Sequence, residues 1–289
     1  MKTSNIIFLA ASLFLVFLSG CYPEDSINVP KTDVEDDLNP TELDQYIEDN
    51  FTKEYGVAIR YKFVDRYVSP GQRVTPPRLE NVKPMLDFID KYWVGPYLAV
   101  ENGNEFFRDH VPAEFILLGG VIYTSRGILL GTADAGARIT LLNVNSIDPE
   151  DEEWLDQQLG TIYHEFAHIV HQLYKLPTDY EKISPQGYSS SGSWFNVSEN
   201  EAIARGFVSP YATSSPNEDF AELVAFYVYF TDFEEKYLTP EENCNTAECE
   251  RMNEGKEKIN QKLVAIKEHY LNVTGLDLDE LRKELQKLL

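Results

Sequence analysis

The chain has 289 residues and a mass of 33.1 kDa, enough for one large domain or two modest ones with a substantial core. Hydrophobic residues make up 43% and charged residues 25%, which excludes wholesale disorder and collagen-like repetition. The formal net charge is -23, from 25 Lys and Arg against 48 Asp and Glu. Because so acidic a surface repels phosphate backbones, we expect no nucleic-acid partner.

The N-terminal residues predict an export signal. Lys2 precedes the apolar stretch IIFLAASLFLVFLSG, which is followed by Cys21. The stretch is shorter than the roughly 20 apolar residues of a membrane span, and its basic start and small final residues are typical of a signal peptide over 1–20. The ending Leu18-Ser19-Gly20-Cys21 resembles the lipobox of bacterial lipoproteins. That resemblance implies a lipidated Cys21 and a membrane anchor. The alternative is an ordinary signal peptide with a chance Cys.

Residues 21–40 are polar and acidic, and this composition predicts a flexible tether. Acidic residues just after a lipidated Cys resemble the surface-export signals of some outer-membrane lipoproteins. The resemblance implies an anchor in the bacterial outer membrane with the protein exposed at the cell surface, and an orientation toward the periplasm stays open.

Two further cysteines, Cys244 and Cys249, are too few for a disulfide framework. No His or additional Cys lies close to them in sequence, which disfavours a structural zinc site. In an oxidising compartment we expect them to form a disulfide rather than free thiols, with no catalytic role.

Residues 41–289 contain no internal repeat and no second linker, so we expect one domain there. In chain order, hydrophobic patterning and turn residues first predict a short helix from near Thr41, a strand within 55–64, a helix ended by Gly95-Pro96, and strands at 115–123 and 137–144. A helix is then predicted to begin at Asp148-Pro149 and to reach about Lys175, with a break near Gly160. The last predicted elements are a helix over about Pro216 to Phe230 and helices over roughly 250–287. Because strands come first and helices later, the predicted class is α+β.

The central predicted helix carries the motif His164-Glu165-Phe166-Ala167-His168. Residues four apart lie on one helix face, so both imidazoles can bind a single metal ion. Glu165 lies about 100° round the helix, beside the metal, where it can take a proton from a water molecule. On the other side, apolar residues recur at helical spacing and should face the core, namely Ile162, Phe166, Ile169 and Leu173.

Three protein ligands would leave zinc an open position, as in catalytic sites. The zincin pattern HExxHxxGxxH is excluded, because His171 and Tyr174 stand where it requires Gly and His. We expect His171 at the rim of the site or behind the ligands rather than among them.

A carboxylate ligand is expected from the helix PNEDFAELVAFYVYF. Glu218 and Glu222 lie one turn apart on the same face. We predict Glu218 as the ligand and Glu222 as the hydrogen-bond acceptor that holds a ligand imidazole in one tautomer. The reverse assignment stays open, and Asp219 is a weaker candidate.

The segments HEFAH, GFVSPYA and EDFAE resemble the gluzincin metallopeptidases related to the catalytic domain of anthrax lethal factor. This resemblance implies a zincin-like fold with a small mixed sheet and C-terminal helices. A Tyr seven residues before the Glu ligand faces the oxyanion in that family, and Tyr211 holds this position relative to Glu218. It also implies an edge strand that pairs with extended substrate, for which ARITLLNV is our candidate.

With its lipobox and C-terminal segment, the whole chain also resembles the substrate import-associated zinc metallohydrolase lipoproteins of outer-membrane nutrient-uptake loci. The resemblance implies a peptide or protein substrate, one zinc ion per chain and a place near outer-membrane importer components. Glu165 would act as general base and Tyr211 would stabilise the oxyanion. The Ser- and Gly-rich loop 184–197 could form a lid, with Trp194 and Phe195 either packed or against substrate. The alternative function is a surface lipoprotein that binds glycan or peptide and keeps a structural or relic zinc site.

Overall fold

The computed structural model describes residues 40–124, 127–129, 131–134, 138–189 and 192–289. Cys21, the signal peptide over 1–20 and almost all of the predicted tether lie outside these residues. Residues Leu43–Leu289 form one compact unit with mixed α and β structure, which confirms the α+β class. Among the described residues, no helix combines the length and the apolar character that a membrane span requires.

The N-terminal part of this unit is mostly helical, and its one strand is shorter than expected. Only Ala58–Arg60 of the expected strand 55–64 forms β1. Gly95-Pro96 does not end a helix, because Pro96 lies at the start of the next helix, where a missing N–H is tolerated. The helical elements here are α2 (Glu42–Ile47), η1 (Glu48–Thr52), α3 (Lys53–Tyr55), η2 (Asp65–Tyr67), α4 (Leu79–Ile89), η3 (Asp90–Val94), α5 (Gly95–Leu98) and α6 (Gly103–His110).

The main sheet has the strand order β1-β2-β6-β5. Strands β1, β2 (Glu114–Leu117) and β6 (Arg138–Leu141) are parallel, while β5 (Gly131–Asp134) runs antiparallel to β6. The sheet is therefore small and mixed, as expected. The prediction that ARITLLNV forms the edge was wrong, because β6 pairs on both sides. Within the described residues, the outermost strand on this side is β5.

The expected strand 115–123 is divided into β2 and β3 (Ile122–Thr124), and β3 forms a hairpin with β4 (Gly127–Leu129). Gly119 lies between the two strands and donates its N–H to the carbonyl of Thr75. A Cβ at Gly119 would lie 2.1 Å from the carbonyl oxygen of Pro76, so this close approach requires glycine. The chain therefore leaves the main sheet at this point.

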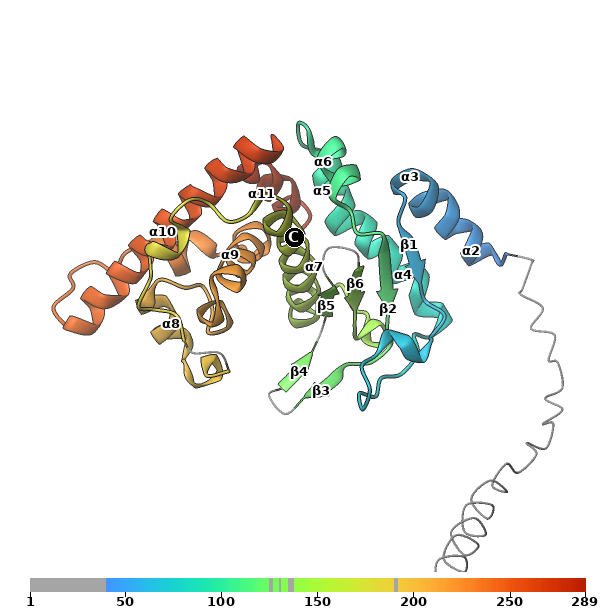
Figure 1. Cartoon of the computed structure of the whole chain (residues 1–289), viewed down its shortest axis with the longest axis horizontal. Helices are drawn as coiled ribbons and strands as arrows, with labels where there is room; N and C mark the ends of the chain where they lie inside the picture. The colour runs from blue at the N-terminus through green and yellow to red at the C-terminus, as the bar shows by residue number, and fades with distance from the viewer. Residues whose placement is uncertain (1–39, 125–126, 130, 135–137, 190–191) are drawn as a thin grey trace, which may run out of the picture. The chain divides into compact units, whose positions relative to one another are not determined.

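Helix α7 (Glu152–Tyr174) lies between strands β5 and β6 on one side and α9 (Pro216–Tyr229) on the other (Figure 1). It begins three residues later than expected: Asp151, not Asp148, is the N-cap, and its carboxylate accepts from the N–H groups of Glu153 and Trp154. The expected break at Gly160 is also absent, and a Cβ at this position would lie 3.4 Å from the ring of Tyr229 on α9. One uninterrupted helix therefore carries the whole motif.

The apolar side of α7 packs into an aromatic cluster. Ile162, Phe166 and Ile169 are buried as expected, and the ring of Phe166 lies 5.1 Å from that of Trp93. The expectation for Leu173 was wrong, because its side chain is 60% exposed near the end of the helix. Helical spacing predicts which side a residue occupies but not where the neighbouring structure ends.

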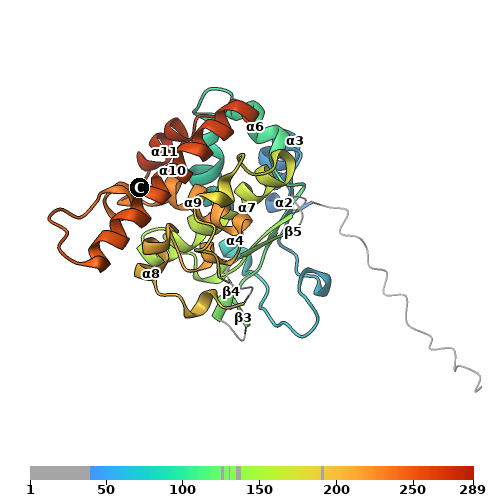
Figure 2. The same ribbon diagram turned by 60° about the vertical axis from the view of Figure 1, so that its left-hand side comes forward.

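The C-terminal part is helical throughout, with α9 (Pro216–Tyr229) close to its predicted bounds. Helices α10 (Ala247–Thr274) and α11 (Leu278–Gln286) both pack on α9 (Figure 2). The elements of this part are η5 (Tyr180–Lys182), η6 (Trp194–Asn196), α8 (Glu199–Arg205), η7 (Tyr211–Ser214), η8 (Glu234–Leu238), α10 (Ala247–Thr274) and α11 (Leu278–Gln286), and η4 (Val144–Ser146) precedes α7.

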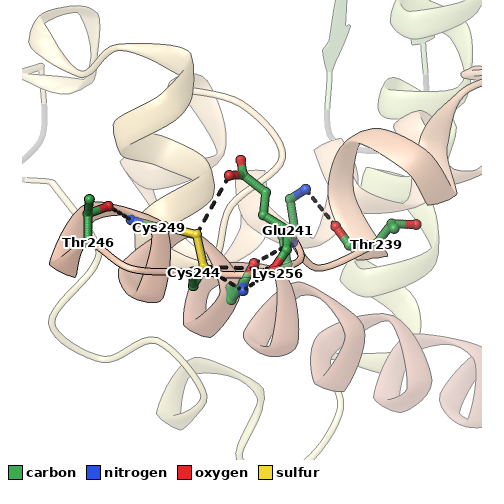
Figure 3. The surroundings of a disulfide bond; sticks show 7 residues. Thr239, Glu241, Cys244, Thr246, Cys249 and Lys256 are labelled. Atoms are coloured by element: carbon green, nitrogen blue, oxygen red, sulfur yellow. Dashed lines mark hydrogen bonds between the residues drawn. A yellow bond between two sulfur atoms is a disulfide. The ribbon is translucent and has the colours of Figure 1, made fainter.

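Cys244 and Cys249 form the predicted disulfide just before and within the first turn of α10 (Figure 3). Thr246 caps this helix by accepting from the N–H of Cys249. Lys256, on the same helix, donates to the carbonyl of Thr239 at 2.7 Å. The disulfide therefore closes a short loop at the start of a helix.

Candidate metal centre

The candidate metal-binding face of α7 is formed by His164 and His168. Because they are four residues apart on a continuous helix, their rings lie side by side, with Nε2 of His168 2.9 Å from Nε2 of His164. The side chains are 10% and 14% exposed, respectively. Two imidazole nitrogens therefore point to one place at the edge of the core.

Helix α9 brings Glu218 to the same place. The hydroxyl of Ser215 caps this helix by accepting from the N–H of Glu218, which holds the residue in the first turn. Oε2 of Glu218 lies 3.1 Å from Nε2 of His168 and 3.2 Å from Nε2 of His164. His164 and His168, which are both distant from Glu218 in sequence, thus contact the same oxygen of its carboxylate.

The geometry of this triangle fits a zinc ion. In a tetrahedral site with bonds of about 2.0–2.1 Å, two ligand atoms lie about 3.3 Å apart. The three separations here are 2.9, 3.1 and 3.2 Å, and two imidazoles with one carboxylate form a donor set that zinc favours. Among the described residues, His164, His168 and Glu218 can offer one atom each to a common metal ion.

The second nitrogen of His164 faces a different carboxylate. Nδ1 of His164 lies 2.8 Å from Oε1 of Glu222, one turn beyond Glu218 on α9. Glu222 in turn accepts from the hydroxyl of Ser209, and that hydroxyl accepts from the N–H of Ala212. This chain of contacts orients the ring so that Nε2 points toward the candidate metal position.

The second nitrogen of His168 faces another imidazole. Nδ1 of His168 lies 2.7 Å from Nε2 of His171, whose side chain is buried. Burial, followed by the charge of His168, lowers the pKa of His171 to about 4, so His171 is neutral at neutral pH. If Nε2 of His168 binds a metal ion, the proton of this ring is on Nδ1, and His168 would donate it to Nε2 of the neutral His171. His171 lies behind a candidate ligand and not beside the metal position.

The charges of the site reinforce one another. Burial alone would lower the pKa of His164, but its contacts with Glu218 and Glu222 outweigh this and raise the pKa to about 10. Burial alone would raise the pKa of Glu218, but the facing His164 and His168 outweigh this and hold the pKa below its usual range. In the protein without metal, His164 is therefore in its doubly protonated form at neutral pH, and a metal ion must displace one of the two ring protons.

A pocket of about 400 Å³ opens onto these residues. Glu165 and Tyr211 both line it, together with His164, His168 and Glu218. The ring of Tyr211 lies 6.0 Å from that of His164. Burial, followed by the charge of Glu218 and a hydrogen bond to it, raises the pKa of Tyr211, so its hydroxyl keeps its proton at neutral pH.

The loop 184–197 reaches this region through one aromatic side chain. The ring of Trp194 lies 5.1 Å from that of Tyr211 in an edge-to-face arrangement, while Phe195 is 51% exposed. Trp194 therefore packs beside a candidate site residue, and Phe195 lies at the surface.

The chain shares its sequence pattern with a known family. Residues 36–279 match the family described as "Putative zinc-binding metallo-peptidase". The chain belongs to this family. It is also similar to the crystal structure, at 2.10 Å resolution, of a putative zinc-binding metallo-peptidase from Bacteroides caccae ATCC 43185. The TM-score is 0.68 and the identity 26%, over 86% of this chain and 94% of that chain. A comparison with curated proteins finds no match.

Membership in a zinc-binding metallopeptidase family agrees with the chemistry of the site.

Sequence reasoning missed Ser209, which contacts Glu222, and the edge position of β5, whose Gly131 lines the pocket. Ser209 lies inside the segment GFVSPYA, so its place two residues before Tyr211 was the signal available. A Cβ at Gly131 would lie 2.1 Å from Cγ2 of Thr161, which explains why a glycine lets β5 approach α7 so closely.

Proposed function

We propose that this protein is a zinc-dependent peptidase of the gluzincin type, with one zinc ion per chain. The observation that carries the proposal is the convergence of His164, His168 and Glu218 at one end of a pocket that Glu165 and Tyr211 also line. His164, His168 and Glu218 are the proposed ligands, and Glu222 is the carboxylate that orients His164. Bound zinc would supply a Lewis acid that polarises the substrate carbonyl and lowers the pKa of a water molecule.

Glu165 is the proposed general base. Its position on α7, next to His164 and at the pocket surface, suits a carboxylate that must reach a water molecule in the open part of the site. As the water oxygen forms a bond to the carbonyl carbon, Glu165 takes the proton from the water. When the carbon–nitrogen bond breaks, Glu165 delivers that proton to the leaving amine.

Tyr211 is the proposed donor to the oxyanion. Because its pKa is raised by burial and by Glu218, the hydroxyl is protonated over the whole neutral range. A protonated hydroxyl at the pocket wall can donate a hydrogen bond to the carbonyl oxygen as negative charge develops there. This role requires no ionisation of Tyr211 at any step.

Substrate would bind as an extended segment along β5. This strand pairs with β6 on one side, and Gly131 at its start lines the pocket. Backbone groups on the outer side of an edge strand can pair with a peptide and hold its scissile bond over the ligands. The substrate class that fits this arrangement is therefore a peptide or an extended segment of a protein.

The cellular setting is part of the proposal and is supported by the sequence alone. A lipidated Cys21 would anchor the protein in the bacterial outer membrane, exposed at the surface, beside importer components that take up nutrients. Mass spectrometry of the mature N-terminus tests the anchor. We expect an acylated Cys21 in the membrane fraction and release of the Cys21→Ala variant, whereas an unmodified residue 21 would contradict it.

The activity is tested by mass-spectrometric analysis of an unbiased peptide pool incubated with the zinc-loaded protein. The matched control is zinc-loaded Glu165→Gln, which removes the proposed base and keeps the size of the side chain. We expect cleavage by the wild type only, with activity about 10²- to 10⁴-fold lower in the variant. Equal cleavage by both would exclude Glu165 as base. A wild-type protein that binds zinc but cuts nothing would favour the alternative role in binding glycan or peptide.

A further inference from the structure

A buried ion pair lies directly behind the candidate metal centre. Nζ of Lys262 on α10 lies 2.8 Å from Oδ2 of Asp219 on α9, and the two side chains are 0% and 1% exposed. Taking two charges out of water costs several kcal/mol for each ion, which only good geometry and further hydrogen bonds offset. The proposed peptidase chemistry uses neither residue. Their placement therefore needs its own explanation.

Lys262 also holds the segment that carries Tyr211. Its ammonium donates to the carbonyl of Gly206 at 2.7 Å and lies 3.7 Å from the centre of the Phe207 ring. Gly206 ends α8, and the chain continues from it to Ser209 and Tyr211. One ammonium group therefore joins α10 to the start of the segment that contacts Glu222 and lines the pocket.

Asp219 holds the first turn of α9 from a different side than the one that faces the candidate metal position. It follows Glu218 directly, and successive side chains on a helix point about 100° apart. While the Glu218 carboxylate lies against His164 and His168, the Asp219 carboxylate is buried against Lys262 and accepts from the hydroxyl of Tyr188 at 2.8 Å. A rotation or shift of this turn would move both carboxylates together.

We propose that Lys262 and Asp219 are positioning residues of the metal centre, which hold Glu218 and the 206–211 segment in a fixed relation to His164 and His168. This inference rests on the proposed metal site and adds two residues to it from outside the pocket. Without the Lys262 ammonium, the first turn of α9 and the 206–211 segment lose one buried group that contacts both of them, and only other contacts, such as that of Ser209 with Glu222, remain between them. Glu218 would then approach the imidazoles less accurately.

The test measures metal binding by the full-length protein, with Zn²⁺ and Co²⁺ as the probes. The variants are Lys262→Met, Asp219→Asn and the double variant, each of which removes charge and keeps side-chain size. Chelator competition gives the zinc dissociation constant, and visible absorption of bound Co²⁺ reports the ligand geometry. We expect zinc affinity to fall roughly 10- to 100-fold in the single variants, the range for residues that orient metal ligands. The Co²⁺ spectrum should change as well.

Two controls separate positioning from general stability. Lys256→Met removes the ammonium of another buried lysine of α10, which contacts the carbonyl of Thr239 near the disulfide (Figure 3); neither residue is among those that line the pocket. It should lower the melting temperature but leave the zinc affinity and the Co²⁺ spectrum unchanged. The double variant leaves neither charge unpaired, so it should regain stability while its zinc affinity stays low.

Wild-type zinc affinity and an unchanged Co²⁺ spectrum in the double variant would overturn the inference, and so would an equal loss of affinity in Lys256→Met. The double variant decides the matter even where Lys262→Met fails to fold. A wild-type protein that binds neither ion would instead remove the proposed function, and this inference with it.

Discussion

The two halves of the candidate metal centre are held in place by different means. On α7, the relation between His164 and His168 follows from one turn of a continuous helix. On the α9 side, Glu218 and Tyr211 belong to a helix and an adjoining segment, and side-chain contacts join these to the rest of the protein. Ser209 contacts Glu222, and Lys262 contacts both Asp219 and Gly206.

This difference indicates where the site is sensitive to change. Local helix geometry persists as long as α7 is folded, so the two imidazoles stay paired. The position of the carboxylate depends on tertiary contacts that a single substitution can remove. Variants on the α9 side should therefore show whether metal binding depends on ligand identity, on orientation or on both.

The largest expected effect is on zinc affinity in Glu218→Ala. Removing a ligand leaves two imidazoles, so the affinity should fall by more than about 100-fold, beyond the range for residues that only orient ligands. Chelator competition on the purified protein measures this. Glu222→Ala is the matched control and should lose less. If Glu222→Ala loses more affinity than Glu218→Ala, the two glutamates have been assigned in the wrong order.

The next largest effect is on the turnover number of Tyr211→Phe, which separates catalysis from zinc binding on the α9 side of the site. Tyr211→Phe removes one hydroxyl, so the turnover number should fall about 100-fold while zinc affinity stays at the wild-type value. Steady-state kinetics on a peptide identified in the cleavage pool measure the first, and chelator competition the second. An unchanged turnover number would show that Tyr211 does not contact the oxyanion.

A smaller effect compares the outer partners of the two imidazoles. His171→Phe removes a neutral nitrogen that faces Nδ1 of His168, and Glu222→Gln removes a carboxylate charge that faces Nδ1 of His164. Because only the second variant removes a charge beside its imidazole, we expect about a tenfold loss of zinc affinity for the first variant and a larger loss for the second. Equal losses would mean that the charge of Glu222 contributes nothing beyond its geometry.

The smallest effect is the change in zinc affinity with each unit of pH. Without metal, Glu218 and Glu222 raise the pKa of His164 to about 10, so below this pH the ring carries a proton that zinc must displace. The apparent affinity should therefore rise about tenfold per pH unit as the pH increases, and it should keep rising above pH 7. Chelator competition at several pH values measures the slope. Levelling near pH 7 would instead indicate an ordinary pKa of 6.5.

Several features of the fold followed from the sequence because they depend on local pattern. The α+β class was predicted correctly, and the bounds of α9 and of the helix that carries HEFAH were predicted within a few residues. The errors occurred where distant segments decide the outcome. Leu173 has the helical spacing of a core residue, but it is 60% exposed because its position lies near the end of α7. The apolar pattern of ARITLLNV predicts a strand, but it does not predict whether another strand, here β5, pairs with its outer side.

The sequence by itself determined that His164 and His168 share one face of α7, the candidate metal-binding face, since helical periodicity places them together whatever surrounds them. It also limited the carboxylate to a few candidates in one helix. Only the tertiary structure decided that Glu218 faces both imidazoles, that Glu222 and Ser209 lie behind His164, and that Lys262 lies behind Asp219. The physical reason is distance along the chain. Local patterns depend on neighbouring residues, whereas these contacts join segments whose relative positions are set by packing of the whole core.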